Sequence, residues 1–125
     1  MNFSQAKKHV SLKFPFSHYM DEEDNTYENI ARTVQKFINE GDSLLDFGSG
    51  PCDKTAIIQA LGFRCSAYDD LSDNWHRLEN NKEKILKFAH DFNIDFKLAS
   101  KGPLPFNKES FEMVMIAEVL KHLHD

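Results

Sequence analysis

The sequence predicts an α/β domain in which a doubly wound, mostly parallel sheet carries helices on both faces. Short apolar segments of strand length alternate along the chain with longer amphipathic segments of helical length, a pattern typical of parallel sheets. One apolar segment runs into the glycine turn Gly48-Ser49-Gly50, and a helical segment follows it at once. Because ligands of such sheets bind beyond the carboxyl ends of the strands, this turn is the first candidate for a binding site.

Length and composition suit one domain with a hydrophobic core. The chain has 125 residues, of which 41% are hydrophobic and 28% are charged, so it has enough apolar surface to offset the entropy of folding. No apolar run approaches the roughly 18 residues of a membrane-spanning helix. The first part of the chain lacks the apolar stretch of a signal peptide, and the expected compartment is therefore the cytoplasm.

The charge balance bears on the class of partner. The chain carries 15 basic and 20 acidic residues, a formal net charge of −5. A protein that binds nucleic acid directly needs a basic face to displace counterions, and this balance argues against such binding. It favours a small molecule, a glycan or a lipid intermediate as the partner.

The N-terminal residues differ from the rest of the chain. Residues 1–20 are mixed and aromatic, and Pro15 prevents a continuous helix there, so an arm or lid is expected instead of a core element. A helix is expected over residues 27–39, where apolar residues recur at helical spacing: Ile30, Val34, Phe37 and Ile38. We therefore divide the chain into an N-terminal arm and cap helix (1–40) and a sheet domain (41–125).

The sheet domain is expected to contain four strands joined by right-handed crossovers. The strands are short apolar runs bounded by turn residues, at residues 43–47, 64–68, 95–98 and 111–116. The helices present apolar residues on one face, and they are expected at residues 53–61, 82–92 and 118–124.

Two nucleotide ligands fit the glycine turn poorly. A dinucleotide fingerprint needs a third glycine, and here that position is Asp53, whose charge would repel a pyrophosphate at the helix N-terminus. A P-loop for a nucleoside triphosphate matches at Gly48, Lys54 and Thr55, but Asp53 again replaces its second glycine.

S-adenosylmethionine fits the turn better, because it carries an ammonium and a sulfonium but no phosphate. Here the sequence resembles the class I S-adenosylmethionine-dependent methyltransferases, whose first strand ends in [DE]-x-G-x-G-x-G. Asp46, Gly48 and Gly50 match this motif. Cys52 replaces the third glycine, a departure that narrows the turn without adding charge.

The resemblance continues downstream of the turn. The family has an acidic residue after its second strand, and Asp69 and Asp70 stand at that position. The family's L-P-F loop, F-D-x-V strand and E-x-L-x-H motif have counterparts in the same order, starting at Leu104, Phe111 and Glu118 respectively.

The resemblance implies a Rossmann-like fold and transfer of a methyl group to an O, N or C nucleophile. Gly48, Ser49 and Gly50 would admit the methionine part of the cofactor. Asp46 would hold its ammonium directly or through water, and Asp69 or Asp70 would accept hydrogen bonds from the ribose hydroxyls.

The resemblance also suggests residues at the adenine side and in the N-terminal arm. Ser100 stands where the family often has an acid that contacts the adenine amine. Glu118, which begins the counterpart of the E-x-L-x-H motif, is the last of the expected cofactor-binding residues. Further candidates for contacts with cofactor or substrate are His18, Tyr19, Trp75 and His76. The sequence identifies neither a general base nor a metal ligand.

The length of the chain limits this expectation. The resembling fold has a seven-stranded sheet, so the chain is expected to be its N-terminal half, with an apolar fourth strand at the edge of the sheet. That edge could pair with a second copy. Two alternatives stay open: a non-catalytic binding or assembly module of methyltransferase-like fold, and a P-loop-like nucleotide-binding domain.

The cysteines and the C-terminal histidines are expected to be structural. Cys52 follows the first strand and Cys65 begins the second, so in parallel strands they lie at opposite ends and do not pair. His122 and His124 are two residues apart on the expected last helix and point to different faces, which disfavours a metal site.

Overall fold

The structure is a computed structural model that describes residues 1–21, 25–72, 78–100, 104–106 and 110–116. Its described strands are β1 (Ser43–Phe47), β2 (Arg64–Asp69), β3 (Asp95–Leu98) and β4 (Met113–Met115). Its helices are α1 (Phe3–Lys13), α2 (Thr26–Phe37), α3 (Asp53–Ala60) and α5 (Asn81–Asp91), with a 3-10 turn η1 (Leu78–Asn80) before α5.

The strands form one sheet in the order β3-β2-β1-β4, and every pairing among them is parallel. The sequence prediction of a parallel sheet is therefore confirmed. Strands β1, β2 and β3 succeed one another toward one edge, whereas β4 lies on the other side of β1. The order reverses between β1 and β4, and such a switch point opens a crevice at the carboxyl ends of the strands.

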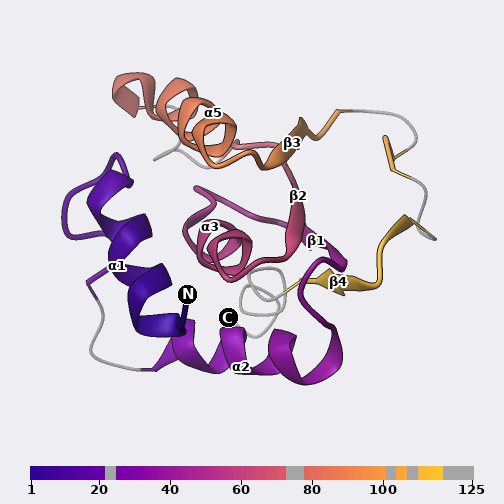
Figure 1. Cartoon of the computed structure of the whole chain (residues 1–125). Coiled ribbons are helices and arrows are strands. Elements are labelled where there is room, and N and C mark those ends of the chain that lie inside the picture. The colour runs from indigo at the N-terminus through magenta and orange to yellow at the C-terminus, as the bar shows by residue number, and fades with distance from the viewer. Residues whose placement is uncertain (22–24, 73–77, 101–103, 107–109, 117–125) are drawn as a thin grey trace.

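The described helices cover one face of the sheet, where α1, α2, α3 and α5 lie together (Figure 1). The other face bears the 104–106 segment, whose Phe106 ring lies 6.1 Å from the ring of Tyr68. The sequence predicted helices on both faces. Within the described residues they lie on one, because two right-handed crossovers that step in the same direction place their helices on the same side.

Helix α1 belongs to the hydrophobic core, so the prediction of an arm or lid over residues 1–20 is wrong. Ala6 and Val10 are fully buried, and they join one core cluster with α3 and with Phe88 of α5. The Asn2 side chain caps the helix at the Gln5 N–H. Pro15 follows soon after the end of α1, as expected.

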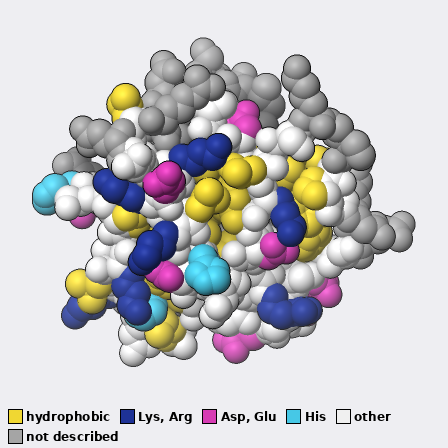
Figure 2. All heavy atoms as spheres, turned by 90° about the horizontal axis from the view of Figure 1, so that it is seen from above, with side chains coloured by type: hydrophobic (Ala, Val, Ile, Leu, Met, Phe, Trp, Pro, Cys, Tyr) yellow, Lys and Arg dark blue, Asp and Glu magenta, His cyan; other side chains and the backbone are white. Residues whose placement is uncertain are grey.

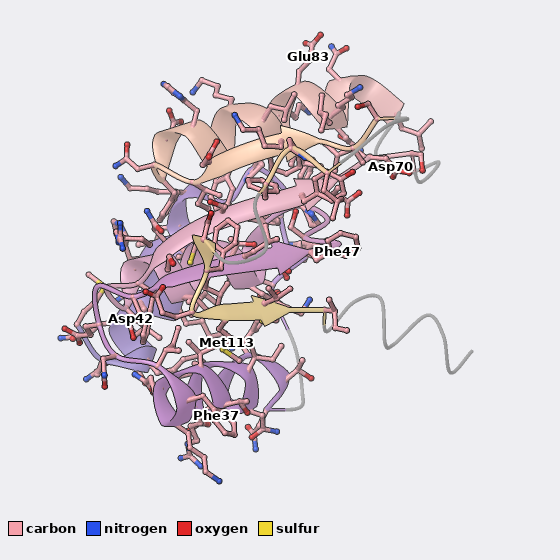
Figure 3. The ribbon with its side chains drawn as sticks, turned by 90° about the vertical axis from the view of Figure 1, so that its right-hand side faces the viewer. Phe37, Asp42, Phe47, Asp70, Glu83 and Met113 are labelled. Carbon is pink, nitrogen blue, oxygen red and sulfur yellow. The ribbon has the colours of Figure 1, made fainter. Side chains whose placement is uncertain are left out.

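Helix α2 confirms the predicted helix, but one of its four apolar positions is misplaced. Tyr27, Ala31 and Val34 are buried, whereas Phe37 is 68% exposed and points away from the sheet (Figure 3). Position 37 completes a helical pattern in the sequence, but it is the last residue of α2 and lies off the face that packs on the sheet.

Strand β4 is shorter than the predicted strand over 111–116. The Glu112 side chain accepts hydrogen bonds from the Ser43 N–H and hydroxyl, and the Glu112 N–H donates to the Ser43 carbonyl at 3.1 Å, so Glu112 is bound to the start of β1 although it precedes β4. The other strands and the helices of the sheet domain begin and end within one or two residues of the predicted bounds. The predicted helix over 118–124 lies outside the described residues.

Two surface properties agree with the composition. On the face drawn in Figure 2, the described Lys, Arg, Asp and Glu side chains are interspersed. Among the described residues, no helix has both the length and the apolar character needed to cross a membrane.

Candidate functional site

The turn after β1 requires left-handed backbone at three alternate residues. Gly48 has φ of 80°, Gly50 of 55° and Cys52 of 70°, a region that glycine enters without steric cost. The Gly48 and Ser49 N–H groups both donate to the carbonyl of Tyr68, at 2.7 and 3.3 Å. The turn is thereby fastened to β2.

Open space lies beside Gly50. A Cβ added to this residue would meet no heavy atom within 4 Å beyond its chain neighbours. A ligand can therefore approach the backbone closely at this point, as the glycine motif predicts.

The Asp69 carboxylate reaches the turn from the end of β2. Its Oδ2 accepts from the Gly50 N–H at 2.8 Å, and its Oδ1 accepts from the Leu71 N–H at 2.8 Å. Each carboxylate oxygen has a second lone pair, so the group has capacity for further donors. The structure thus brings together the glycine motif and one of the two predicted ribose acids.

Asp70 is directed elsewhere. Its exposed side chain accepts from the Ser72 N–H at 2.9 Å and the Ser72 hydroxyl at 2.8 Å, and these bonds lower the pKa of the carboxyl. It lies at the same end of the sheet as Phe47 (Figure 3), where it closes the loop after β2.

Asp46 is buried beneath the turn. It is 2% exposed, and its Oδ2 accepts a hydrogen bond from the Thr55 hydroxyl at 2.6 Å. This bond ties the end of β1 to α3. It also argues against the P-loop alternative, because the fully buried Thr55 hydroxyl faces Asp46 and not a phosphate or its metal ion.

Asp53 heads a polar cluster that sequence reasoning missed. The carboxylate is 2% exposed, and its Oδ2 accepts from the Tyr27 hydroxyl at 2.5 Å. Lys54 Nζ lies 3.8 Å from the same oxygen. In the sequence Asp53 is a mismatch to two nucleotide motifs, and no local pattern links it to Tyr27, 26 residues earlier.

Two buried polar atoms, one in the turn and one at the start of α3, have no hydrogen-bond partner in the described part of the chain. They are Ser49 Oγ and Asp53 Oδ1. Buried polar atoms are nearly always hydrogen-bonded. Two such atoms without a partner, in and next to the glycine turn, therefore require an explanation.

The remaining candidates lie around or outside this site. Ser100 is exposed just after β3, and the preceding Ala99 N–H donates to the Asp69 carbonyl at 2.9 Å. His18 pairs with Asp21, and the Tyr19 ring lies 5.4 Å from that of Phe14. Glu118, Trp75, His76, His122 and His124 lie outside the described residues.

Both cysteines are free and buried, which confirms that they do not pair. Burial raises the pKa of the Cys52 and Cys65 thiols, so neither is an activated nucleophile. In the described ranges, no three His, Cys, Asp or Glu side chains are grouped as metal ligands.

The fold resembles several solved structures. The PH0226 protein of Pyrococcus horikoshii is 20% identical with a TM-score of 0.50, covering 80% of this chain and 47% of that one. A candidate S-adenosyl-L-methionine-dependent methyltransferase of Methanococcus maripaludis is 19% identical with a TM-score of 0.51, covering 90% and 48%. Coclaurine N-methyltransferase, bound to N-methylheliamine and S-adenosylhomocysteine, is 15% identical with a TM-score of 0.51, covering 91% and 40%.

These likenesses concern the fold. The chain spans about half the length of the solved structures that it matches, or somewhat less. No family model matches the sequence, and no curated protein does so at a significant level. With its parallel β3-β2-β1-β4 sheet and these structural neighbours, the chain has a Rossmann-like α/β fold of the methyltransferase type.

Proposed function

We propose that this chain binds S-adenosyl-L-methionine at the glycine turn and acts as a methyltransferase on a small molecule, a glycan or a lipid intermediate. The observation that carries the proposal is the 2.8 Å hydrogen bond from the Gly50 N–H to the Asp69 carboxylate. It joins the turn after β1 to the acid after β2, at the sheet edge where ligands of this fold bind. The S-adenosylhomocysteine in coclaurine N-methyltransferase, a structural neighbour, agrees with this proposal.

The residues at the turn fit such a cofactor. The space beside Gly50 admits a ligand close to the backbone, and we assign the ribose hydroxyls to Asp69, with Asp70 shaping its loop. Gly48 and Ser49 would line the methionine side. Ser100, which follows the strand beside Asp69, would face the adenine, and Glu118 is kept as a proposed contact.

An apolar cavity near the turn supports a small acceptor with an apolar body. The cavity of about 360 Å³ lies on the sheet face opposite the helices, and its lining is Leu45, Phe47, Leu104, Phe106, Val114 and Ile116. Pockets for small molecules are lined largely by apolar side chains. This cavity adjoins the point between β1 and β4 where the strand order reverses. Strand β2, which ends in Asp69, pairs with the other side of β1.

The cofactor supplies a methyl group on a sulfonium for in-line displacement by the acceptor's nucleophile. The contribution of this chain would be positioning and exclusion of water, both of which accelerate such a transfer. The apolar lining residues would perform the second task.

Calorimetric titration with S-adenosylhomocysteine tests the proposal. We expect saturable binding by the wild-type chain, a loss of about tenfold or more in Asp69→Asn, and little change in Asp70→Asn. The two variants remove the same charge at neighbouring positions, so their difference reports the ribose contact. A folded wild-type chain that binds no cofactor would refute the proposal.

A second candidate function, a binding or assembly module, has one observation in its favour. Val114 is 48% exposed on β4, whose described pairing partner is β1 alone, and unpaired strand edges readily accept another strand. We propose that a second copy pairs there, which would account for an apolar edge without requiring catalysis.

A further inference from the structure

A second cavity lies at the end of the sheet opposite the glycine turn. Its volume is about 660 Å³, and residues in or beside helices α1, α3 and α5 line it, among them His9, Lys13, Gln59, Phe88, Asp91 and Phe92. We call it the α1–α5 cavity. Pockets for small molecules have volumes of roughly 300–1,000 Å³, so this cavity is large enough for a small metabolite.

The α1–α5 cavity is separate from the glycine turn. Gln59 accepts a hydrogen bond from the Cys65 N–H near the start of β2, whereas Asp69, the last residue of β2, reaches the glycine turn. Four residues of strand separate these two contacts by about 13 Å. In Figure 3 the two ends of the sheet are marked by Asp42, just before β1, and by Phe47, its last residue. A ligand in the α1–α5 cavity would therefore not occupy the proposed cofactor site.

Part of the lining is fixed by hydrogen bonds and by ring packing. The Gln59 Oε1 accepts from a backbone N–H of β2 at 2.7 Å, and its Nε2 donates to the Asn93 carbonyl at 3.2 Å. The rings of Phe88 and Phe92 lie 4.8 Å apart, and the ring of His9 lies 5.5 Å from that of Phe92. The cavity thus has a preformed lining with an aromatic surface on which an apolar group can pack.

The side of the cavity formed by α1 is basic. His9 and Lys13 are four residues apart and therefore lie on the same face of α1. Among the described residues, neither side chain forms an ion pair or a hydrogen bond. The Lys13 ammonium has three donors and the His9 imidazole has at least one. A carboxylate on a ligand suits this side of the cavity.

The side formed by the ends of α3 and α5 has the opposite character. Asp91 is the last residue of α5, and its Oδ2 lies 3.3 Å from Lys87 Nζ at the surface. Because such surface pairs are weak, the Asp91 carboxylate can accept a hydrogen bond from a further donor. The carbonyl groups at the C-terminal ends of helices also favour positive charge. An ammonium group on a ligand suits this side of the cavity.

We infer that the α1–α5 cavity binds a free amino acid with an apolar side chain. The α-carboxylate of this ligand lies toward His9 and Lys13, and its α-ammonium lies toward Asp91. Its side chain packs against Phe88 and Phe92. A ligand with only a negative charge would meet Asp91 unfavourably, and one with only a positive charge would meet Lys13 unfavourably, so the cavity selects the molecule that carries both.

Nuclear magnetic resonance titration of the isotope-labelled chain tests the inference, because each backbone amide reports where a ligand binds. The probes are L-phenylalanine, 3-phenylpropionate, which lacks the ammonium, and phenethylamine, which lacks the carboxylate. The test variants are Lys13→Met and Asp91→Asn. Their controls are Lys8→Met on α1 and Glu83→Gln on α5, because both residues are exposed and neither lines the cavity.

The first expected result concerns the place of binding. L-phenylalanine shifts the amide signals of His9, Gln59 and Asn93 until they reach a plateau, and it leaves the amide signal of Gly50 unchanged. Both of the other probes bind more weakly than L-phenylalanine, since each of them lacks one of the two charged groups.

The second expected result concerns the two charges of the ligand. Lys13→Met weakens the binding of L-phenylalanine about 3- to 10-fold and does not weaken that of phenethylamine. Asp91→Asn weakens the binding of L-phenylalanine by a similar factor and does not weaken that of 3-phenylpropionate. Lys8→Met and Glu83→Gln leave the affinity for all three probes unchanged.

Three results would overturn the inference. One is that L-phenylalanine causes no saturable shifts at the cavity amides of the folded wild-type chain. Another is that it shifts the Gly50 signal instead, which would place the amino acid at the glycine turn. The third is that Lys13→Met and Asp91→Asn each weaken all three probes equally, which would mean that neither charge is recognised. None of these results bears on the cofactor proposal, which the titration with S-adenosylhomocysteine tests separately.

Discussion

Glycine at position 50 serves both the backbone and the ligand space. Its φ of 55° is costly for any side chain with a Cβ, by roughly 1–2 kcal/mol, and the adjacent space is open. Gly41 has a φ of 90° and equally open surroundings, but it lies at the other end of β1. Substitutions at Gly50 and Gly41 can therefore separate the effect of backbone strain from the effect of filling the space of the ligand.

We therefore predict that Gly50→Ala lowers the free energy of unfolding by about 1 kcal/mol and also abolishes S-adenosylhomocysteine binding. Gly41→Ala should lower stability by a similar amount and leave binding intact. Urea unfolding and calorimetry measure the two effects. Normal cofactor binding by Gly50→Ala would show that the ligand does not approach this residue.

At Ser49 we expect that removal of a buried hydroxyl does not lower the free energy of unfolding. Its hydroxyl oxygen is buried without a partner among the described residues, so removing it relieves an uncompensated desolvation of about 1 kcal/mol. Ser49→Ala should leave the ligand-free chain as stable as the wild type or slightly more stable, as measured by urea unfolding. A clear loss of stability would mean that the hydroxyl forms a bond essential to the turn.

At the scale of the elements, substitutions in α1 test whether this helix packs in the core. Val10 is fully buried in the core, whereas Leu12 on the same helix is 75% exposed. Val10→Ala should lower the free energy of unfolding by about 2 kcal/mol through lost burial and a residual cavity, and Leu12→Ala by less than about 0.5 kcal/mol. Thermal or urea unfolding distinguishes these values, and equal small effects would mean that α1 is an arm after all.

The start of β4 is coupled to pH through Glu112. Its hydrogen bonds from the Ser43 hydroxyl and N–H lower the pKa of the Glu112 carboxyl below its ordinary 4.5. A folded-state pKa below the unfolded one stabilises the fold above the unfolded pKa, and this contribution is lost as pH falls through the folded pKa.

Glu112→Gln should therefore be less stable than the wild type at neutral pH, and the difference should shrink as the pH falls below 4.5 through the lowered folded-state pKa of the carboxyl. Urea unfolding over a series of decreasing pH values measures this difference. The same substitution at the exposed Glu83 of α5 is the control. A difference that is constant with pH would indicate that the charge of Glu112 plays no part.

At the scale of the whole molecule, the two edges of the sheet differ in their surroundings. Val114 of β4 borders an apolar cavity on one face and an apolar groove beside α2 on the other. Leu98 of β3, the opposite edge strand, is 40% exposed. Both are apolar residues on edge strands, and a lysine at such a position blocks strand pairing.

If a second copy pairs through β4, sedimentation should show a dimer that Val114→Lys converts to a monomer and Leu98→Lys does not. A monomeric wild-type chain at high concentration would refute the assembly proposal. It would leave the cofactor proposal untouched, because the turn and Asp69 lie within one chain.

Local patterns in the sequence predicted the positions of the strands and most helices. A strand such as β1 is a short apolar run that ends at a glycine turn, and these signals are contained in a few adjacent residues. The glycine motif likewise predicted a tight turn after β1, and Gly48 and Gly50 there have the positive φ that glycine adopts without steric cost.

Tertiary structure decided which residues share a partner. Periodicity describes the faces of one segment, but burial and hydrogen bonding depend on segments distant in sequence. Val10 is in the core because α1 packs on α3, and Asp69, not Asp70, reaches Gly50 because of the way that β2 ends beside the turn. The sequence by itself therefore determined the fold class and the position of the glycine turn after β1, whereas the contact between Tyr27 and Asp53 arose only when α2 and α3 were packed together.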